Sequence, residues 1–531
     1  MIRISNIRLP LDYTDETIRK RVCRELRISD SDLLGVTLSR RSVDARKKEQ
    51  VHFLCSVDVR LTGKEDAVVR RCKNAVKAAP YRYDVPQWKG GATPVVIGMG
   101  PAGLFAGLVL AQSGAKPIII ERGKDVDSRT KDVSRFWLTG ALDPSSNVQF
   151  GEGGAGTFSD GKLNTGTKDS RQRKVLEEIV RHGAPDEILY NAKPHIGTDK
   201  LRITVRGIRE EIVALGGTVL FETTLTGLKT ANGKLFAAVV EHNGKTEVID
   251  TDNLILAIGH SARDTFAMLH ALSLPMEAKP FSVGARIEHL REKIDRAQYG
   301  SFAGTGHLGA AYYKMNVHTQ NGRGAYTFCM CPGGTVVNAS SEPGRLCTNG
   351  MSEFSRNGTN SNAALLVSVS PEDFGSDSPL AGVEFQRRLE ESAFMLGGGN
   401  YHAPVQRVGD FLANRKSERF GEVLPSFLPK TEMANLHEIL PATIGASMKE
   451  AIVAMGKKLR GFDHPDALLT GPETRSSSPV RIPRSMDSLE SIGMGGLYPC
   501  GEGAGYAGGI ISAAVDGMKC AEKIIEKNGN V

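Results

Sequence analysis

A glycine-rich segment of the chain, residues 98–103, has the spacing of a loop that holds a chain of phosphates. In such a loop Gly98 permits a tight turn, Gly100 lets a pyrophosphate approach the backbone, and Gly103 lets a helix pack closely. Further along, Glu121 is placed to accept hydrogen bonds from a ribose 2′-OH, and its charge repels a 2′-phosphate. These residues therefore predict a dinucleotide site that favours a ribose with a free 2′-OH.

The glycines need a strand before them and a helix after them. Residues 95–97 are apolar and short enough for a buried strand, and residues 101–113 predict a helix with proline in its first turn. Gly114 stands where a helix-ending glycine belongs, and residues 117–120 predict a second strand. The sequence therefore predicts a βαβ unit that presents the helix N-terminus to the phosphates.

The G-x-G-x-x-G pattern alone is weak evidence, because the chain contains 59 glycines. Two further matches, at 151–156 and 304–309, have neither a suitable strand before them nor a helix pattern after them. Only the copy within residues 94–122 combines strand, turn, helix, second strand and acid. We therefore assign the dinucleotide site to residues 94–122.

Composition is that of an ordinary globular protein with several domains. The 531 residues are 40% hydrophobic and 24% charged. No apolar run reaches about 18 residues, and the N-terminus lacks the apolar segment of a secretory signal, so we expect no membrane span and a cytoplasmic location. Eight cysteines are too few for a disulfide scaffold, and the C-x-C pair Cys329 and Cys331 lacks a zinc-site partner, so we expect no metal.

Positive charge is concentrated in the first part of the chain. Residues 1–89 contain 20 Lys and Arg against 12 Asp and Glu, whereas the whole chain has a net charge of +7. The interpretation we favour is a solvated surface. The alternative is a docking face for an acidic partner or a nucleic acid, and we consider nucleic acid the weaker possibility.

The same leading segment has the pattern of a small α+β module. Its predicted elements are a strand at 2–9, a helix from Asp15, strands at 34–40 and 51–61, and a helix at 65–78. This order resembles part of a ferredoxin-like unit. Residues 80–91 contain Pro, Tyr, Trp and Gly-Gly, which indicates a linker to the next domain.

Three later segments resemble those of known flavoproteins: GEGGAGTFSDGKLNTG at 151–166, TDNLILAIGHSARDTF at 251–266, and GLYPCGEGAGYAGGIISAAVDGMKCAEKII at 496–525. With the βαβ unit, they make the chain resemble the glutathione-reductase-like FAD superfamily. More closely, it resembles the bacterial family of uncharacterised FAD-dependent dehydrogenases, in which a small N-terminal module precedes the flavin fold. The resemblance covers most of the chain and implies FAD as a non-covalently bound cofactor.

The resemblance also implies which residues contact FAD. The first group surrounds the phosphates and ribose: Gly98, Gly100, Pro101, Ala102, Gly103, Glu121, Arg122, Leu225, Ala257 and Gly259. The second group lies in the loop at 151–166: Gly153, Gly154, Thr157, Ser159, Gly161 and Lys162. The third group comes from the last segment: Gly501, Glu502, Gly508, Gly509 and Ile510. In this resemblance Glu502 bonds the ribityl hydroxyls, and a helix opened by Gly508 and Gly509 points at the flavin.

The predicted fold class is α/β, with a discontinuous three-layer FAD-binding Rossmann-like domain, an inserted α+β substrate domain and the N-terminal module. The expected divisions are 1–89 for the module and linker, 90–274 and 441–531 for the FAD-binding domain, and 275–440 for the insert. Within the insert, the polar residues 344–362 predict an ordered loop.

Candidate catalytic residues lie in the insert. Arg286 has the chemistry to clamp an acidic substrate, and His289 has the chemistry of an acid or base. Cys329 and Cys331 allow thiol redox chemistry, although known flavin disulfide reductases carry their cysteines just after the first βαβ unit. Each of these residues has a purely structural role as its alternative.

The function that these observations favour is an FAD-dependent oxidoreductase acting on a small-molecule substrate or electron acceptor, neither of which the sequence identifies. No second Rossmann motif was found for a nicotinamide. Either NAD(P)H binds transiently as reductant, or the substrate itself reduces the flavin. The alternative from another class is a flavin-bearing RNA- or protein-binding factor that uses the basic N-terminal module.

Overall fold

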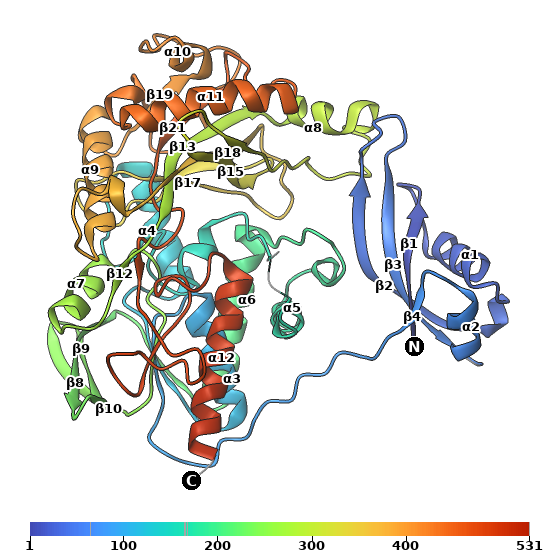
Figure 1. The fold of residues 1–531 in the computed structure, drawn as a ribbon, viewed down its shortest axis with the longest axis horizontal. Coiled ribbons are helices and arrows are strands. Elements are labelled where there is room, and N and C mark those ends of the chain that lie inside the picture. Colours follow the sequence, from blue (N-terminus) through green and yellow to red (C-terminus); the bar gives the residue numbers. More distant parts are fainter. Residues whose placement is uncertain (64, 164–165, 167, 530–531) are drawn as a thin grey trace.

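A computed structural model describes residues 1–63, 65–163, 166 and 168–529. At its centre lies a five-stranded parallel sheet with the strand order β23-β11-β5-β6-β7 (Figure 1). The strands are β5 (Val95–Ile97), β6 (Ile118–Ile120), β7 (Thr218–Leu220), β11 (Leu254–Leu256) and β23 (Leu497–Pro499). The first two strands and the helix between them form the predicted βαβ unit. Strands from both halves of the chain therefore pair in one sheet, which makes this domain discontinuous.

Helices and a second sheet cover the two faces of the parallel sheet. Helices α3 (Pro101–Ser113), α6 (Gly197–Ala214) and α12 (Ile510–Gly529) share a hydrophobic core with one face. Strands β8 (Thr223–Ala231), β9 (Lys234–His242) and β10 (Lys245–Asp250) form an antiparallel sheet whose apolar side chains pack with the other face. This three-layer arrangement confirms the predicted fold class.

Close packing between α3 and its neighbours depends on glycine. A Cβ on Gly103 would lie 1.8 Å from the carbonyl oxygen of Gly98, and one on Gly517 would lie 2.0 Å from that of Ala102. Neither contact is physically possible, so glycine is required at both positions. These contacts fix the N-terminus of α3 against the phosphate loop and against α12.

The insert is built on a seven-stranded sheet of order β14-β15-β18-β13-β21-β19-β20. Its strands are β13 (Phe281–Leu290), β14 (Asn316–His318), β15 (Gly324–Cys331), β18 (Asn360–Val369), β19 (Ala403–Arg407), β20 (Thr431–Met433) and β21 (Leu468–Glu473). Helices α9 (Ala381–Leu396) and α11 (Ala442–Lys458) contribute to its hydrophobic core. Because α11 and β21 belong to this unit, the insert continues past the expected boundary at residue 440.

The remaining described helices and strands connect these units. They are α4 (Val126–Thr139), α5 (Arg171–Arg181), α7 (Arg263–Ala271), α8 (Arg291–Tyr299), α10 (Val408–Leu412), β12 (Glu277–Ala278), β16 (Thr335–Asn338), β17 (Thr348–Met351) and β22 (Val480–Arg481). Strands β16 and β17 pair with each other. The prediction of a loop over 344–362 was therefore wrong in part, because β17 and the start of β18 lie within it.

The N-terminal module forms a four-stranded antiparallel sheet of order β2-β3-β1-β4, the order of a ferredoxin-like unit. Its elements are β1 (Ile2–Leu9), α1 (Asp15–Leu26), β2 (Leu33–Asp44), β3 (His52–Leu61), α2 (Glu65–Arg71) and β4 (Ala75–Lys77). The prediction of one helix over 65–78 was wrong, because the chain leaves the helix after Arg71 and pairs Ala75–Lys77 with β1. A short segment can gain more from sheet hydrogen bonds than from another helical turn.

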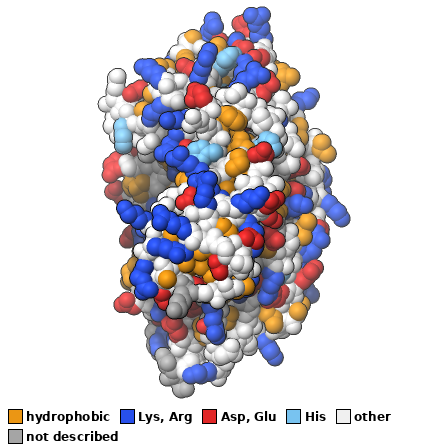
Figure 2. Space-filling view, turned by 90° about the vertical axis from the view of Figure 1, so that its right-hand side faces the viewer, with side chains coloured by type: hydrophobic (Ala, Val, Ile, Leu, Met, Phe, Trp, Pro, Cys, Tyr) orange, Lys and Arg blue, Asp and Glu red, His pale blue; other side chains and the backbone are white. Residues whose placement is uncertain are grey.

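The module lies beside the main body and is joined to it by an extended linker (Figure 1). Arg41 makes the contact between them: its N–H donates to Tyr190 O (2.6 Å), its carbonyl accepts from Ala192 N (2.8 Å), and its guanidinium pairs with Glu187 (3.2 Å). Basic and acidic side chains are interspersed on the face of the molecule shown in Figure 2. Among the described helices, none is both long and apolar enough to cross a bilayer.

Candidate active site

A cavity of about 870 Å³ lies between the parallel sheet and the inserted sheet. One side is formed where β5, β6, β11 and β23 end, which is where open parallel sheets bind ligands. The other side comes from the insert, including Tyr313, Cys329, Gly350 and Glu473. The fold therefore brings segments that are hundreds of residues apart to one site.

Most of the residues predicted to contact a cofactor line this cavity. They are Gly98, Gly100, Pro101, Ala102, Glu121, Arg122, Gly154, Ser159, Gly161, Lys162, Leu225, Ala257, Gly259, Glu502, Gly508, Gly509 and Ile510. Gly103, Gly153, Thr157 and Gly501 do not line it and lie behind its wall. Residues 164 and 165 of the predicted loop lie outside the described residues.

The phosphate loop leaves space where a pyrophosphate would approach. Gly98 has a φ of 94°, and a Cβ there would lie 2.4 Å from the carbonyl oxygen of Ala257, so this position requires glycine. In contrast, among the described residues a Cβ on Gly100 would meet only the Cα of Gly154, at 3.8 Å. Gly100 thus opens onto the cavity beside the first N–H groups of α3, which lack acceptors within the helix.

Glu121 is held rigidly at the end of β6. Its Oε1 accepts the N–H groups of Gly123 and Gly151, both at 2.9 Å, and its Oε2 accepts that of Met99 at 2.8 Å. A carboxylate has about four acceptor positions, so Oε2 retains one. The sequence did not reveal these three bonds, which orient the carboxylate and leave it able to accept one further hydroxyl.

Comparison with known proteins identifies the family. An uncharacterised protein of Clostridium beijerinckii is 50% identical over 532 residues, covering 99% of each chain. The family model "FAD-dependent protein, C-terminal domain-like" matches residues 280–476, and "Domain of unknown function (DUF8436)" matches residues 1–60. The chain belongs to this bacterial family of FAD-dependent proteins. Its cofactor is FAD.

Solved structures of flavoenzymes are similar only at a distance. The 3-ketosteroid-delta4-(5alpha)-dehydrogenase from Rhodococcus jostii RHA1 is 13% identical with a TM-score of 0.36, covering 83% of this chain and 97% of that one. The E. coli quinol fumarate reductase FrdA is 13% identical with a TM-score of 0.37, covering 82% and 70%. TM-scores below 0.5 do not bear on the reaction of this family member.

The cavity has polar groups suited to the rest of FAD. Glu502 lines the wall, and burial raises its pKa to about 7, with Lys279 opposing that effect. The N-terminal turn of α12 also reaches the cavity, and a Cβ added at Gly508 or Gly509 would meet no atom of the described residues within 4 Å. The residues present therefore fit a dinucleotide that extends from the phosphate loop toward α12.

On the insert side, a β-bulge directs Cys329 toward the cavity. The register of β15 against β18 shifts between Phe328 and Cys331, and Cys329 has a φ of 38°. Bulges often redirect side chains beside active sites. Arg286 holds the bulge, because its Nη2 donates to Cys329 O at 3.0 Å.

Two predicted catalytic residues do not reach the cavity. Arg286 is fully buried behind Gly350, where a Cβ would lie 1.8 Å from its Nη2, so it cannot clamp a substrate directly. His289 lies on the opposite face of β13, and its Nε2 bonds Phe462 O at 2.8 Å. Burial lowers the pKa of His289 to about 4, so it is neutral at physiological pH. His289 points away from the cavity because alternate residues of a strand point to opposite faces, whereas Arg286 lies on the cavity side but is covered by Gly350.

Cys329 and Cys331 both line the cavity, and both are free thiols. Cys329 is exposed to the cavity, whereas Cys331 is buried. Loss of solvation between the cavity walls raises the pKa of Cys329 to about 12, although Lys162 partly opposes this effect. The Sγ of Cys331 accepts from Arg286 Nη2 at 3.3 Å. Since the thiolate is the reactive form, these residues are poor nucleophiles at neutral pH.

We therefore expect Cys329 to resist alkylation. At pH 8 a thiol of pKa about 12 is ionised to only about one part in 10⁴, whereas an ordinary thiol of pKa about 8.5 is ionised to roughly a quarter. Iodoacetamide labelling followed by peptide mass spectrometry at pH 7 to 10 would measure this difference. Labelling at pH 7 as fast as that of a cysteine-containing peptide would contradict it.

Sequence reasoning missed several residues of the wall, among them His260, Tyr313 and Glu473. Burial lowers the pKa of His260 to about 3, so this side chain is a neutral hydrogen-bonding group. It immediately follows Gly259 in the segment that predicted cofactor contacts, and that position was the available signal. Glu473 ends β21, and its place beside the cavity depends on strand pairing that no local pattern reveals.

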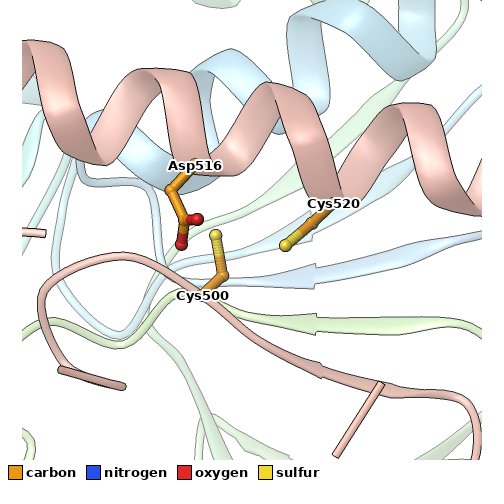
Figure 3. A group of neighbouring side chains, drawn as sticks. All are labelled: Cys500, Asp516 and Cys520. Atoms are coloured by element: carbon orange, nitrogen blue, oxygen red, sulfur yellow. The ribbon is translucent and has the colours of Figure 1, made fainter. Parts of the chain in front are cut away.

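Cys500, which lines the cavity, forms a buried group with Asp516 and Cys520, and the three side chains converge (Figure 3). Arg484 donates to both oxygens of Asp516, at 2.6 and 3.0 Å, and Gly501 N donates to Oδ2 at 2.8 Å. The carboxylate is thus engaged by a guanidinium, a charge that disfavours a cation. This group fastens the end of β23 to α12.

Proposed function

We propose that the protein is an FAD-dependent oxidoreductase that holds FAD non-covalently in this cavity and acts on a small molecule at the wall of the insert. The observation that supports it is the continuity of the cavity. One end is the phosphate loop around Gly100, and the other end is the polar wall that includes Cys329 and Glu473. When bound, FAD supplies the redox chemistry, and the protein supplies position and electrostatics.

In this proposal each part of the cavity has a role in binding. The backbone around Gly98 and Gly100 and the N-terminus of α3 receive the pyrophosphate. The remaining acceptor of Glu121 takes a ribose hydroxyl, and the backbone at Leu225 contacts adenine. Glu502 bonds the ribityl chain, while the N-terminus of α12 stabilises negative charge near the ring.

The charged groups at the insert side would orient the substrate. Asp160 pairs with Lys162 at 3.1 Å and accepts a hydrogen bond from Arg356 Nε at 2.9 Å. Burial acts to raise the pKa of Asp160, but these two cations lower it to about 2, so the carboxylate is ionised. Arg475 lines the same region and donates to Ser261 Oγ and Ser341 Oγ. Together these groups favour a polar substrate with a hydrogen-bond acceptor.

The alternative of an RNA- or protein-binding factor would act through residues 1–89. Basic side chains, with acidic ones among them, lie on the face shown in Figure 2, and this distribution by itself does not favour that function over the redox proposal. The electron donor in our proposal is either a transiently bound NAD(P)H or the substrate itself.

Purified protein is expected to be yellow, with close to one FAD per chain released on denaturation. Anaerobic titration with NADH, NADPH and dithionite then identifies the donor. Rapid bleaching by one nicotinamide is the result expected if NAD(P)H is the reductant, and bleaching by dithionite alone points to the substrate. Protein that stays colourless and takes up no added FAD would overturn the proposal.

A further inference from the structure

His260 lies between the two segments that the proposed function assigns to FAD. It belongs to the loop after β11, the strand between β5 and β23 in the parallel sheet. On one side of this loop, a Cβ on Gly98 would lie 2.4 Å from the carbonyl oxygen of Ala257. On the other side, a Cβ on Gly503 would lie 2.5 Å from that of Gly259. A dinucleotide that runs from the phosphate loop toward α12 therefore passes this loop, where His260 lines the cavity.

One nitrogen of the His260 ring is engaged, and the other is open. Nδ1 lies 3.0 Å from Ser261 Oγ, at hydrogen-bond distance. Nε2 makes no hydrogen bond within the described part of the chain, and it is not enclosed by protein, so it opens onto the cavity that His260 lines. Whether Nε2 can donate or accept a hydrogen bond depends on which ring nitrogen carries the proton. The neighbours of Ser261 decide that question.

Gln149 fixes the direction of the hydrogen bond between Ser261 and His260. The Nε2 of Gln149 donates to Ala339 O at 3.0 Å, an atom that can only accept, so Oε1 is the atom that faces Ser261. Ser261 Oγ lies 3.1 Å from this Oε1 and donates to it, because Oε1 carries no hydrogen. The single hydrogen of the hydroxyl is thereby used. The Nδ1 of His260 must then donate to Ser261 Oγ, since two lone pairs 3.0 Å apart would repel each other.

Arg475 completes the set of bonds around the Ser261 hydroxyl. Its Nη1 donates to Ser261 Oγ at 3.2 Å and to Ser341 Oγ at 2.6 Å. A hydroxyl donates one hydrogen bond and accepts two. The bond to Gln149, the bond from Arg475 and the bond from His260 fill these three places. The tautomer with the proton on Nδ1 therefore satisfies all three contacts, and it leaves a lone pair on Nε2.

The ring is also neutral, so Nε2 keeps this lone pair. Loss of solvation and the charges of Arg475 and Arg263 lower the pKa of His260 to about 3, although Glu390 opposes them. The imidazolium, which would donate from both nitrogens, is therefore not populated at pH 7. An ionised phosphate has no hydrogen to donate, so Nε2 is suited to a hydroxyl or N–H group and not to the pyrophosphate.

We propose that His260 is a cofactor-binding residue whose Nε2 accepts a hydrogen bond from a hydroxyl or N–H group of FAD, and that Gln149 and Ser261 are positioning residues that keep the proton on Nδ1. The identity of the ligand rests on the proposed function, whereas the tautomer does not. Together with Glu121 and Glu502, His260 provides acceptors for the parts of FAD that carry hydroxyl and N–H groups. The backbone N–H groups of the phosphate loop receive the remaining part, the pyrophosphate.

Two-bond ¹H–¹⁵N NMR of the holoprotein, labelled with ¹⁵N-histidine, tests the tautomer. The signals of His260 are those that disappear in His260→Gln. In wild type at pH 7, Nδ1 is expected to have the ¹⁵N shift of a protonated nitrogen, and Nε2 that of an unprotonated one. In Gln149→Met these two shifts are expected to move toward each other, because the freed hydroxyl of Ser261 can donate to Nδ1.

Ser341→Ala is the matched control for the NMR measurement. It removes the other partner of the same Arg475 nitrogen and leaves the contacts of Ser261 with His260 and Gln149 in place, so its shifts should be those of wild type. A proton on Nε2 in wild type, or unchanged shifts in Gln149→Met, would overturn the proposal. The wild-type measurement decides the tautomer even if Gln149→Met does not fold.

The affinity for FAD tests the ligand. Dissociation on dilution of the holoprotein, followed by flavin fluorescence, gives Kd. His260→Leu cannot accept a hydrogen bond and is expected to bind FAD about tenfold more weakly than wild type. His260→Gln supplies an amide oxygen near the position of Nε2, so its Kd is expected to stay within about threefold of wild type.

Equal affinities of these two variants, whether near the wild-type value or below it, would overturn the proposal. In the first case the lone pair of Nε2 would face something other than FAD, and in the second the bulk of the ring would matter and not its acceptor. Neither the NMR nor the affinity measurement needs electron transfer. Loss of the redox chemistry alone would therefore count against the proposed function and not against this contact.

Discussion

Replacing Gly100 by valine is expected to abolish FAD binding while leaving the fold intact. The φ and ψ of Gly100 are −71° and −176°, an extended conformation that valine adopts readily. The space beside its Cα is open to the cavity, and in the part of the chain that the structure describes Gly154 Cα is the only atom near the position of a Cβ, at 3.8 Å. The new side chain would therefore occupy the place of the pyrophosphate without disturbing the protein.

We expect bound FAD to fall below about a tenth of the wild-type content, which corresponds to a loss of more than about 1.4 kcal/mol at FAD concentrations well below the wild-type Kd. The flavin absorbance of purified protein measures the content, and circular dichroism reports the fold. Gly309→Val is the matched control, since Gly309 is exposed and a Cβ there would meet nothing within 4 Å. Full FAD content in the Gly100 variant would remove the phosphate loop from the site.

Replacing Glu390 by glutamine is expected to destabilise the protein by about 3–5 kcal/mol, the usual cost of leaving buried charges uncompensated. Glu390 is fully buried and makes paired hydrogen bonds with two arginines, at 2.8 and 2.9 Å to Arg263 and at 2.7 and 2.9 Å to Arg475. Both guanidinium groups are also buried. Because Arg475 lines the cavity, the same change should loosen the cavity wall.

Thermal and urea unfolding of the holoprotein would measure the effect. Glu391→Gln is the control, because Glu391 is 51% exposed and its ion pair with Arg345 should contribute no more than about 1 kcal/mol. Burial acts to raise the pKa of Glu390, but the two arginines lower it overall. The contribution of this carboxylate to the free energy of unfolding is therefore fully present above about pH 4.3, the pKa of an unfolded glutamate, and is lost as the pH falls toward the lowered pKa of the folded state. Similar unfolding midpoints for the two variants would contradict this assignment.

Local pattern was sufficient to predict the phosphate loop and its βαβ unit. The turn at Gly98, the helix at 101–113 and the glycine at 114 each depend on backbone conformation and neighbouring residues, which are local properties. The order of helices and strands in the N-terminal module was also predictable, except for its last strand. That strand, Ala75–Lys77, pairs with a strand about 70 residues earlier in the chain. Local propensity does not encode such a partner.

The insert side of the cavity depended on tertiary structure. In a strand, side chains point alternately to the two faces of the sheet, so Arg286 and His289 of β13 must lie on opposite faces. This alternation does not say which of the two faces meets the cavity. The approach of Glu473 to Arg286 follows from the pairing of β21 with β13, between segments far apart in the chain. The sequence by itself thus determined the dinucleotide loop, because that signal is local, while FAD was implied by the resemblance of three further segments to those of known flavoproteins. The folded chain decided which charged groups face the reacting end and which are buried behind it, because strand pairing and burial set their positions and their pKa values.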